Sequence, residues 1–140
     1  MLDLQDFAER YTAAWNSDDP SAVAAFYSEH ASITINGGEP SVGRDALTAT
    51  FNGYMVAFPD LLLLMDELDL TGDRPIYHWT LVGTNTGPGG TGNKVRISGS
   101  ETWVIGEDDL VAESIGSYDA EEYGRQLEHG VDAEQKTSSH

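Results

Sequence analysis

Residues 76–85 read IYHWTLVGTN, residues 86–93 read TGPGGTGN, and residues 94–105 read KVRISGSETWVI. The first and third segments are rich in β-branched and aromatic residues, so they are predicted strands. The glycine-rich segment between them predicts a long hairpin loop rather than a phosphate loop, because a strand and not a helix follows it. Further strands are predicted over residues 61–70 and 110–117, and the short linkers between neighbouring strands favour an antiparallel meander.

Helices are predicted before and after this meander. Apolar residues recur at helical spacing over residues 4–15, and Asp3 is a candidate N-cap. A second, short helix is expected over residues 20–27, because proline suits the first helical turn. A third helix is expected over residues 44–57, and a last short one over residues 120–127.

The order of these elements indicates the fold class. A short strand is predicted over residues 31–35, and an Asn-Gly-Gly turn follows it. Helices followed by an antiparallel sheet predict an α+β fold. The length of 140 residues fits one domain, which we place over residues 1–128. Residues 129–140 are polar and are expected to form a disordered tail.

The strong negative charge limits the partners that the protein can bind. Seven basic residues stand against 24 acidic ones, which gives a formal net charge of −17. Binding to nucleic acids or to anionic membranes is therefore not expected. The charge favours solubility, and it favours a neutral or cationic ligand over an anionic one. No apolar run reaches about 18 residues, and the N-terminus lacks the pattern of a signal peptide, so a cytoplasmic protein is expected.

Metal ions and cofactors are not expected from the residue types present. The chain has no cysteine, which removes disulfides, thiolate ligands and a cysteine nucleophile. Its four histidines do not share a spacing that is typical of metal ligands. The prediction is a protein without a bound metal or cofactor.

Two sequence segments resemble those of a known family. Residues 78–87 (HWTLVGTNTG) resemble the strand and loop of the SnoaL-like polyketide cyclases, which belong to the nuclear transport factor 2-like superfamily. Residues 110–113 (LVAE), together with Asp119 and residues 126–127 (QL), resemble the family's closing pattern. The resemblance implies a cone-shaped α+β barrel, in which about three N-terminal helices and a short C-terminal helix wrap a curved antiparallel sheet around an apolar pocket.

The resemblance also implies an oligomeric state. It indicates a homodimer formed through the outer face of the sheet. Three side chains would form an apolar patch there if they point outward. They are Val82, Thr102 and Val104.

Asp119 is the first candidate catalytic residue, and its role is implied by the resemblance. It matches the aspartate that acts as general acid/base in the family's intramolecular aldol closure. The tryptophan that usually precedes this aspartate is replaced by residues 114–117 (SIGS). The alternative is that Asp119 caps the C-terminal helix, which begins directly after it.

Glu101 and His78 are the other candidate catalytic residues. The strand period of two places Glu101 and Trp103 on one face, where a desolvated carboxyl can hold a proton and donate it to an oxyanion. The ketosteroid isomerases, relatives in the same superfamily, carry an acid at the matching position. The alternative for Glu101 is a cross-strand pair with Arg96 or Lys94. His78 can polarise a carbonyl oxygen, or it can be a structural residue.

A further group of residues is predicted to bind the ligand. Asn36 can donate to a ligand oxygen, although turn formation also explains it. Aromatic side chains can line the pocket and stack on a flat ligand, although core packing explains their helical spacing equally. They are Tyr11, Trp15, Tyr54, Phe58 and Trp103.

These residues together lead to one functional prediction with two alternatives. The prediction is a cofactor-free cyclase- or isomerase-type enzyme that performs general acid/base chemistry on a small, neutral, apolar carbonyl compound. The first alternative is a non-catalytic protein that binds a small molecule or serves assembly. The second is epoxide-hydrolase-like addition of water, although residues 99–101 lack the Arg-x-Asp pattern of that group. A simple ketosteroid isomerase is disfavoured, because residues 34–36 contain no acid.

Overall fold

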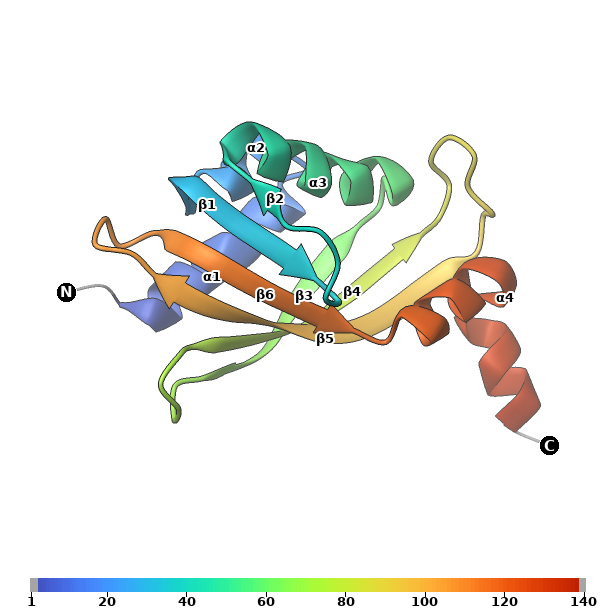
Figure 1. Cartoon of the computed structure of the whole chain (residues 1–140). Helices are drawn as coiled ribbons and strands as arrows, with labels where there is room; N and C mark the ends of the chain where they lie inside the picture. Colours follow the sequence, from blue (N-terminus) through green and yellow to red (C-terminus); the bar gives the residue numbers. More distant parts are fainter. Residues whose placement is uncertain (1–2, 139–140) are drawn as a thin grey trace.

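The computed structural model describes residues 3–138, and the side chains of residues 3–131. One curved sheet is covered on its inner face by three helices, and a fourth helix lies at one end (Figure 1). The helices are α1 (Leu4–Asn16), α2 (Pro20–Ala24), α3 (Arg44–Ala57) and α4 (Ala120–Ser138). The strands are β1 (Tyr27–Ile35), β2 (Ser41–Val42), β3 (Leu62–Asp69), β4 (Ile76–Thr84), β5 (Lys94–Ile105) and β6 (Val111–Tyr118).

The six strands form a single sheet in the order β2-β1-β6-β5-β4-β3. Strands β3 to β6 pair antiparallel in sequence order, as the predicted meander requires. Strand β1 pairs parallel with β6, and the two-residue strand β2 pairs antiparallel with the other edge of β1. Among the described residues the sheet does not close, so the predicted α+β cone is confirmed as an open, curved sheet rather than a sealed barrel.

Side-chain caps fix where the first two helices begin. The Asp3 carboxylate accepts a hydrogen bond from the Asp6 backbone N–H at 3.1 Å, as the sequence predicts for an N-cap. The Asp19 carboxylate accepts from the Ser21 backbone N–H at 3.0 Å, and Pro20 occupies the first turn of α2. These caps satisfy backbone donors that the first helical turn leaves free.

The predicted boundaries differ from the structure at β1. The expected second helix reaches residue 27, but α2 ends at Ala24 and β1 already begins at Tyr27. Tyr27 pairs with Val111 of β6, and the Val111 N–H donates to the Phe26 carbonyl at 2.9 Å. Pairing with a strand about 80 residues away therefore overrides the local helical pattern.

The C-terminal helix is longer than predicted. Its backbone continues to Ser138, with a non-helical break at Gly130, where φ is 78°. The predicted tail over residues 129–140 therefore includes helical backbone. Residues 139–140 lie outside the described part of the chain.

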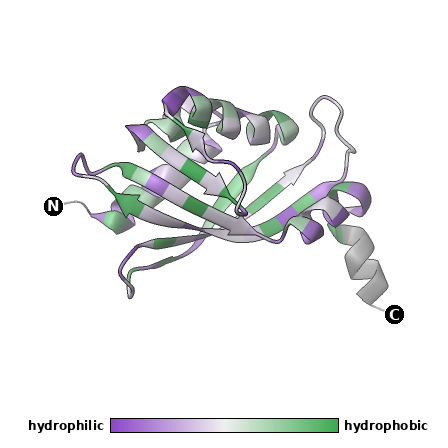
Figure 2. Cartoon of the chain, viewed as in Figure 1, coloured by the Kyte–Doolittle hydropathy of each residue, from purple (hydrophilic) through white to green (hydrophobic). Residues whose placement is uncertain are grey.

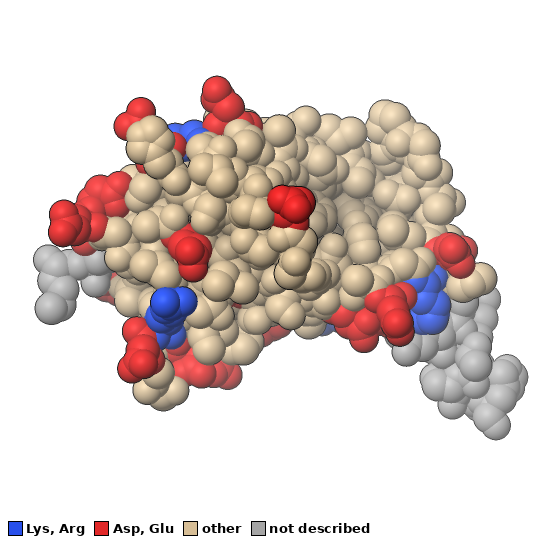
Figure 3. All heavy atoms as spheres, viewed as in Figure 1, with Lys and Arg blue, Asp and Glu red and all other residues tan. Residues whose placement is uncertain are grey.

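The two faces of the sheet differ in polarity. Along β5, buried residues alternate with more exposed ones, and the inward side carries Val95, Ile97, Glu101 and Trp103. Apolar residues lie along the strands and on the helices that face them (Figure 2). On the surface shown in Figure 3, acidic side chains far outnumber basic ones. The fold thus encloses an apolar interior inside an acidic shell.

The outer face of the sheet carries the residues of the expected dimer patch. Val82, Thr102 and Val104 alternate with buried inward residues and are half-buried. Dimerisation through this face stays a prediction. None of the described helices has the length and apolar character that a bilayer crossing needs.

Candidate functional site

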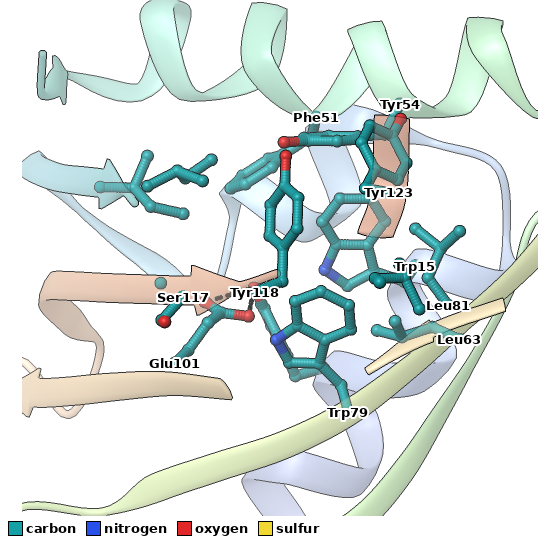
Figure 4. Close-up of a pocket in the computed structure, with 15 residues that line it drawn as sticks. Trp15, Phe51, Tyr54, Leu63, Trp79, Leu81, Glu101, Ser117, Tyr118 and Tyr123 are labelled. Carbon is teal, nitrogen blue, oxygen red and sulfur yellow. Dashed lines mark hydrogen bonds between the residues drawn. The ribbon is translucent and has the colours of Figure 1, made fainter. Parts of the chain in front are cut away.

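An internal pocket lies between the inner face of the sheet and helices α1, α3 and α4 (Figure 4). Its cavity volume is about 60 Å³. A cavity needs about 10–15 Å³ to hold one water molecule, so the pocket has room for a small molecule. Its walls are mostly aromatic and aliphatic. The lining residues are Tyr11, Trp15, Ile33, Ile35, Phe51, Tyr54, Leu63, Trp79, Leu81, Ile97, Glu101, Gly116, Ser117, Tyr118 and Tyr123.

Glu101 brings a carboxyl group into this apolar pocket. It is 7% exposed and lies on the inward side of β5. Its Oε1 accepts hydrogen bonds from the Tyr27 hydroxyl at 2.9 Å and from Ser114 Oγ at 2.8 Å. The Trp103 indole N–H also donates to Oε1, at 3.3 Å. The Tyr11 hydroxyl lies 3.1 Å from each of the two oxygens. These five residues form the Glu101 cluster.

Burial of Glu101 favours a neutral carboxyl. Burial raises the pKa of Glu101 above its ordinary value, although the hydrogen bonds from Ser114 and Tyr27 act in the opposite direction. The ion pairs found among the described residues do not involve Glu101. Without a cation to compensate, burial disfavours the ionised form. The carboxyl therefore keeps its proton to a higher pH than an exposed glutamate does.

The two tyrosines of the cluster remain hydrogen-bond donors. Burial and the neighbouring Glu101 carboxylate raise the pKa of the Tyr11 and Tyr27 hydroxyls well above their ordinary value. The two hydroxyl oxygens lie 2.9 Å apart. Neither hydroxyl loses its proton at physiological pH.

The hydrogen bonds allow the cluster to hold either protonation state of Glu101. When the carboxyl is ionised, Tyr11 can donate to Oε2 while Tyr27 donates to Oε1. When the carboxyl is neutral, Oε2–H can donate to Tyr11, Tyr11 to Tyr27, and Tyr27 to Oε1, which closes a ring. Three other groups crowd Oε1, so Oε2 is the oxygen with room for the proton. A proton can thus leave or return without leaving a hydroxyl of the ring unpaired.

Trp15 supplies a donor without an acceptor. Its indole nitrogen is buried and makes no hydrogen bond of normal length and angle among the described residues, although it lies close enough to the Tyr11 hydroxyl to lower the pKa of that group. The side chain is 8% exposed and packs edge-on against Phe51, with ring centroids 5.3 Å apart. An unsatisfied buried donor costs about 1–3 kcal/mol. Figure 4 shows this nitrogen facing the interior of the pocket.

Three tyrosines mark the side on which the pocket approaches solvent. Tyr54 of α3, Tyr118 at the end of β6 and Tyr123 of α4 are all half-buried pocket residues. The rings of Tyr118 and Tyr123 meet edge-on, with centroids 5.4 Å apart. The rim is therefore aromatic with polar tips, which suits the entry of an amphipathic compound.

The comparison with protein families agrees with this architecture. Residues 8–114 match the SnoaL-like domain family. The chain belongs to the SnoaL-like domain family. No curated protein sequence matches the chain significantly. The predicted resemblance to this family is confirmed.

Solved structures of similar proteins extend over nearly the whole SnoaL-like domain. TsrD from Streptomyces laurentii is 25% identical, with a TM-score of 0.76 over 91% of this chain and 98% of that chain. A candidate SnoaL-like polyketide cyclase from Jannaschia sp. is 14% identical, with a TM-score of 0.73 over 89% and 92%. An NTF2-like protein of unknown function from Exiguobacterium sp. is 17% identical, with a TM-score of 0.68 over 81% and 98%. The two structures with lower identity establish the nuclear transport factor 2-like fold alone.

Several of the predicted site residues come together in the SnoaL-like domain. Tyr11, Glu101 and Trp103 meet in the Glu101 cluster, and Trp15 and Tyr54 line the pocket. Trp103 does not line the pocket, because its ring stacks on Tyr77. Phe58 does not line the pocket either.

Phe58 lies in the core and not in the pocket wall. It is fully buried, and its side chain lies over Gly83, where an added Cβ would come within 3.0 Å of it. Its ring also lies 6.3 Å from that of Tyr123. Phe58 therefore supports the rim from behind rather than touching a ligand.

The structure does not place Asp119 in the pocket. Its side chain is exposed, and Oδ1 accepts a hydrogen bond from the Glu122 backbone N–H at 3.0 Å. Its carbonyl accepts from the Tyr123 N–H at 3.0 Å. The geometry is that of an N-cap for α4, which is the alternative that the sequence left open.

His78 lies on the outer face of the sheet, away from the pocket. It alternates along β4 with Tyr77 and Trp79, which point inward, so its imidazole cannot polarise a carbonyl oxygen in the pocket. Its ring nitrogens lie near Glu67 and Asp69, and the three potential ligand atoms are within 4.8 Å of one another. These residue types can bind divalent metals, but they face away from the Glu101 cluster.

Asn36 is a structural residue at the end of β1. It has a φ of 53°, which suits the turn that follows. Its side-chain oxygen accepts from the Tyr118 N–H at 2.9 Å, and its own N–H donates to the Gly116 carbonyl at 2.9 Å. Asn36 is exposed and positions the end of β6 rather than a ligand.

Sequence reasoning missed several residues of the site. The helix predicted over residues 20–27 includes Tyr27, and Ser114 appears only within the segment that departs from the family pattern. The period of two along β6 would have placed Ser114 and Tyr118 on one face, and along β4 it would have placed Trp79 opposite His78. Tyr123 gave no comparable signal, because its position depends on how α4 meets the end of β5.

Proposed function

We propose that this SnoaL-like domain is a cofactor-independent enzyme that acts on a small, neutral, mainly apolar carbonyl compound, with Glu101 as the general acid. The observation that supports the proposal is a buried carboxyl that lines an apolar pocket and has no ion-pair partner among the residues that the structure describes. In this proposal Glu101 takes the role that the family resemblance assigned to Asp119.

The chemistry follows from the neutral carboxyl. A protonated Glu101 can donate a hydrogen bond to the carbonyl oxygen of a bound ketone and stabilise the negative charge that develops when a neighbouring C–H bond breaks. The apolar surroundings strengthen this interaction, because little water screens it. A positioned acid of this kind contributes about 10²–10⁴-fold to the rate.

The Glu101 cluster also provides for the ionised state that follows proton transfer. Once the proton has moved to the ligand oxygen, the carboxylate is held by hydrogen bonds from Tyr11, Tyr27 and Ser114. The carboxylate then takes the proton from the carbon next to the carbonyl, so that the enol forms and the Glu101 carboxyl is neutral again. This sequence suits a keto–enol isomerisation or an intramolecular aldol closure.

Ligand binding without turnover is the second candidate function. Glu101 is the one carboxyl among the described residues that line the pocket, and an imidazole is absent from that lining. Removal of a proton from carbon requires a base, and a single carboxyl must then act as both acid and base. The same scarcity of charged groups weakens the case for epoxide-hydrolase-like water addition, which needs a carboxylate to position the water.

Exchange of carbon-bound protons tests the proposal directly. The probe is 2-indanone, a flat neutral ketone whose protons next to the carbonyl are activated, and proton NMR in D₂O follows their replacement by deuterium. We expect the wild-type protein to accelerate exchange over buffer, and Glu101→Gln to lose at least ~100-fold of that acceleration. The matched control is Glu113→Gln, a half-buried β6 residue outside the pocket, which should match the wild type.

Two results would contradict the proposal. Equal exchange rates for Glu101→Gln and the wild type would remove Glu101 from the chemistry. Binding of 2-indanone without any acceleration of exchange would favour the non-catalytic candidate. The melting temperature of each variant, measured by circular dichroism, shows whether the comparison is made between folded proteins.

A further inference from the structure

The unpaired indole nitrogen of Trp15 points to a second polar contact with the ligand. This nitrogen is buried, makes no hydrogen bond of normal geometry among the described residues beyond a weak approach to the Tyr11 hydroxyl, and faces the pocket interior (Figure 4). The other buried side-chain polar atoms of the described residues all have hydrogen-bond partners. Trp15 is therefore an exception in an otherwise satisfied interior, and such exceptions call for an explanation.

Packing prevents the indole from turning to find a partner. Its ring is held edge-on by Phe51, with centroids 5.3 Å apart, and by Tyr54, with centroids 6.4 Å apart. Trp15 also lies one helical turn after Tyr11 on the same face of α1, so both side chains reach the pocket. The N–H direction is thus set before any ligand enters.

An indole nitrogen can only donate a hydrogen bond, so the group that satisfies it is an acceptor. We propose that Trp15 is a specificity-determining residue that donates from Nε1 to an acceptor oxygen of the ligand, such as a carbonyl or ether oxygen. The ligand class is therefore a neutral oxygenated compound, rather than a pure hydrocarbon or an amine. This inference deepens the proposed function and rests on the same pocket being the ligand site.

The proposal favours a neutral oxygenated ligand, whereas the net charge alone would favour a cationic one. A net charge of −17 attracts cations over a long range, which would favour an ammonium ligand. An ammonium group brings only donors, however, and leaves the Trp15 N–H unpaired. Three probes of one carbon skeleton separate these alternatives: 2-indanone carries an acceptor, indane carries no polar group, and 2-aminoindane carries an ammonium.

Nitrogen–proton NMR of the indole groups gives the most direct test. The chain has three tryptophans, so three indole signals are expected, and Trp15→Phe identifies the one from Trp15. We expect 2-indanone to move the Trp15 signal downfield, as a new hydrogen bond does, whereas indane should not. The two probes share the same aromatic ring, so ring-current effects on the signal are matched.

Affinity measurements with the Trp15→Phe variant give an independent readout. The net gain from one hydrogen bond predicts a loss of roughly 3–10-fold in affinity for 2-indanone. Affinity for indane should stay unchanged, which controls for the altered packing. The wild-type protein should bind 2-aminoindane more weakly than 2-indanone. If Trp15→Phe does not fold, Trp79→Phe and Trp103→Phe assign the other two indole signals, and the NMR comparison in the wild-type protein still decides the question.

The possible outcomes separate this inference from the proposed function. If 2-indanone binds without a specific shift of the Trp15 signal, or binds Trp15→Phe as tightly as the wild type, the inference is wrong while Glu101 can still act as the acid. If the Trp15 signal shifts but Glu101→Gln leaves proton exchange unchanged, Trp15 does contact the ligand, and the proposal that Glu101 is the general acid is wrong. If neither 2-indanone nor indane binds, both proposals are wrong.

Discussion

The hydroxyl of Tyr27 lies 2.9 Å from Glu101 Oε1, although 74 residues separate the two along the chain. The contact exists because β1 runs parallel to β6, and β6 in turn pairs with β5. Tyr27 stands at the first residue of β1, and Ser114 of β6 lies between it and the β5 carboxyl in the sheet order. The sheet topology thus assembles the Glu101 cluster except for Tyr11, which helix α1 supplies.

Removal of the Tyr27 hydroxyl should destabilise the protein. Tyr27→Phe takes away a donor to the buried carboxyl and leaves Glu101 less well satisfied, so we expect a loss of about 1–3 kcal/mol in the free energy of unfolding. Urea denaturation at neutral pH measures this change. Tyr123→Phe is the matched control, because its half-buried rim hydroxyl makes no hydrogen bond among the described residues, and its change should stay within about 0.5 kcal/mol. Equal stability of Tyr27→Phe and the wild type would show that the cluster does not hold the carboxyl.

The pH dependence of stability should reveal the buried carboxyl. The folded-state pKa of Glu101 is raised, whereas the pKa of an unfolded glutamate is about 4.3. Between these values the folded state binds more protons, so stability falls as pH rises. The contribution is fully present below the unfolded pKa and is lost as pH rises through the folded pKa.

Comparison with Glu101→Gln isolates this contribution from that of other groups. Hydrogen bonds lower the pKa of several surface aspartates, Asp60 and Asp69 among them, and these groups change stability in the opposite direction. Their effect is shared by both proteins and cancels in the difference. We expect the stability of Glu101→Gln relative to the wild type to increase as pH rises from about 4 towards neutrality. A difference that stays flat or shrinks would contradict a raised pKa.

Two substitutions of Asp119 separate its capping role from a catalytic one. Asp119→Ala removes the cap of α4 and should cost about 0.5–2 kcal/mol of stability, whereas Asp119→Asn keeps a good cap and should cost little. Thermal denaturation measures both. Neither variant should change the 2-indanone exchange rate, because the carboxylate lies outside the pocket. Lost exchange activity in a fully stable Asp119→Asn would restore Asp119 as the acid/base.

Local patterns in the sequence were sufficient to predict most of the secondary structure. Helix α3 and strand β5 begin and end at the predicted residues, because hydrophobic periodicity and flanking turn residues act locally. The same local rule predicts that Glu101 and Trp103 share a face, as they do in the structure. The α+β class and the family resemblance were predicted correctly for the same reason.

The parts that escaped prediction depend on contacts between distant segments. Tyr27 reaches the site because β1 pairs parallel with β6, and no local sequence pattern predicts that pairing. Asp119 fits both a cap and a catalytic motif, and only the orientation of α4 decides between them. Strand alternation places His78 on the face opposite to Tyr77 and Trp79, and only the chemistry of the imidazole favours a role in the site. The buried, unpaired nitrogen of Trp15 required coordinates, since burial and partners cannot be read from spacing.

The most direct test of the account is the titration of Glu101 itself. Carbon-13 NMR of the side-chain carboxyl groups, in protein labelled at glutamate and assigned with Glu101→Gln, reports the protonation of this one residue against pH. The account predicts a Glu101 midpoint clearly above about 4.3, the ordinary value for glutamate, and above the midpoints of the exposed glutamates in the same spectra. A midpoint at or below the ordinary value would mean that the carboxyl is ionised in the pocket, and Glu101 could not then serve as the proton donor.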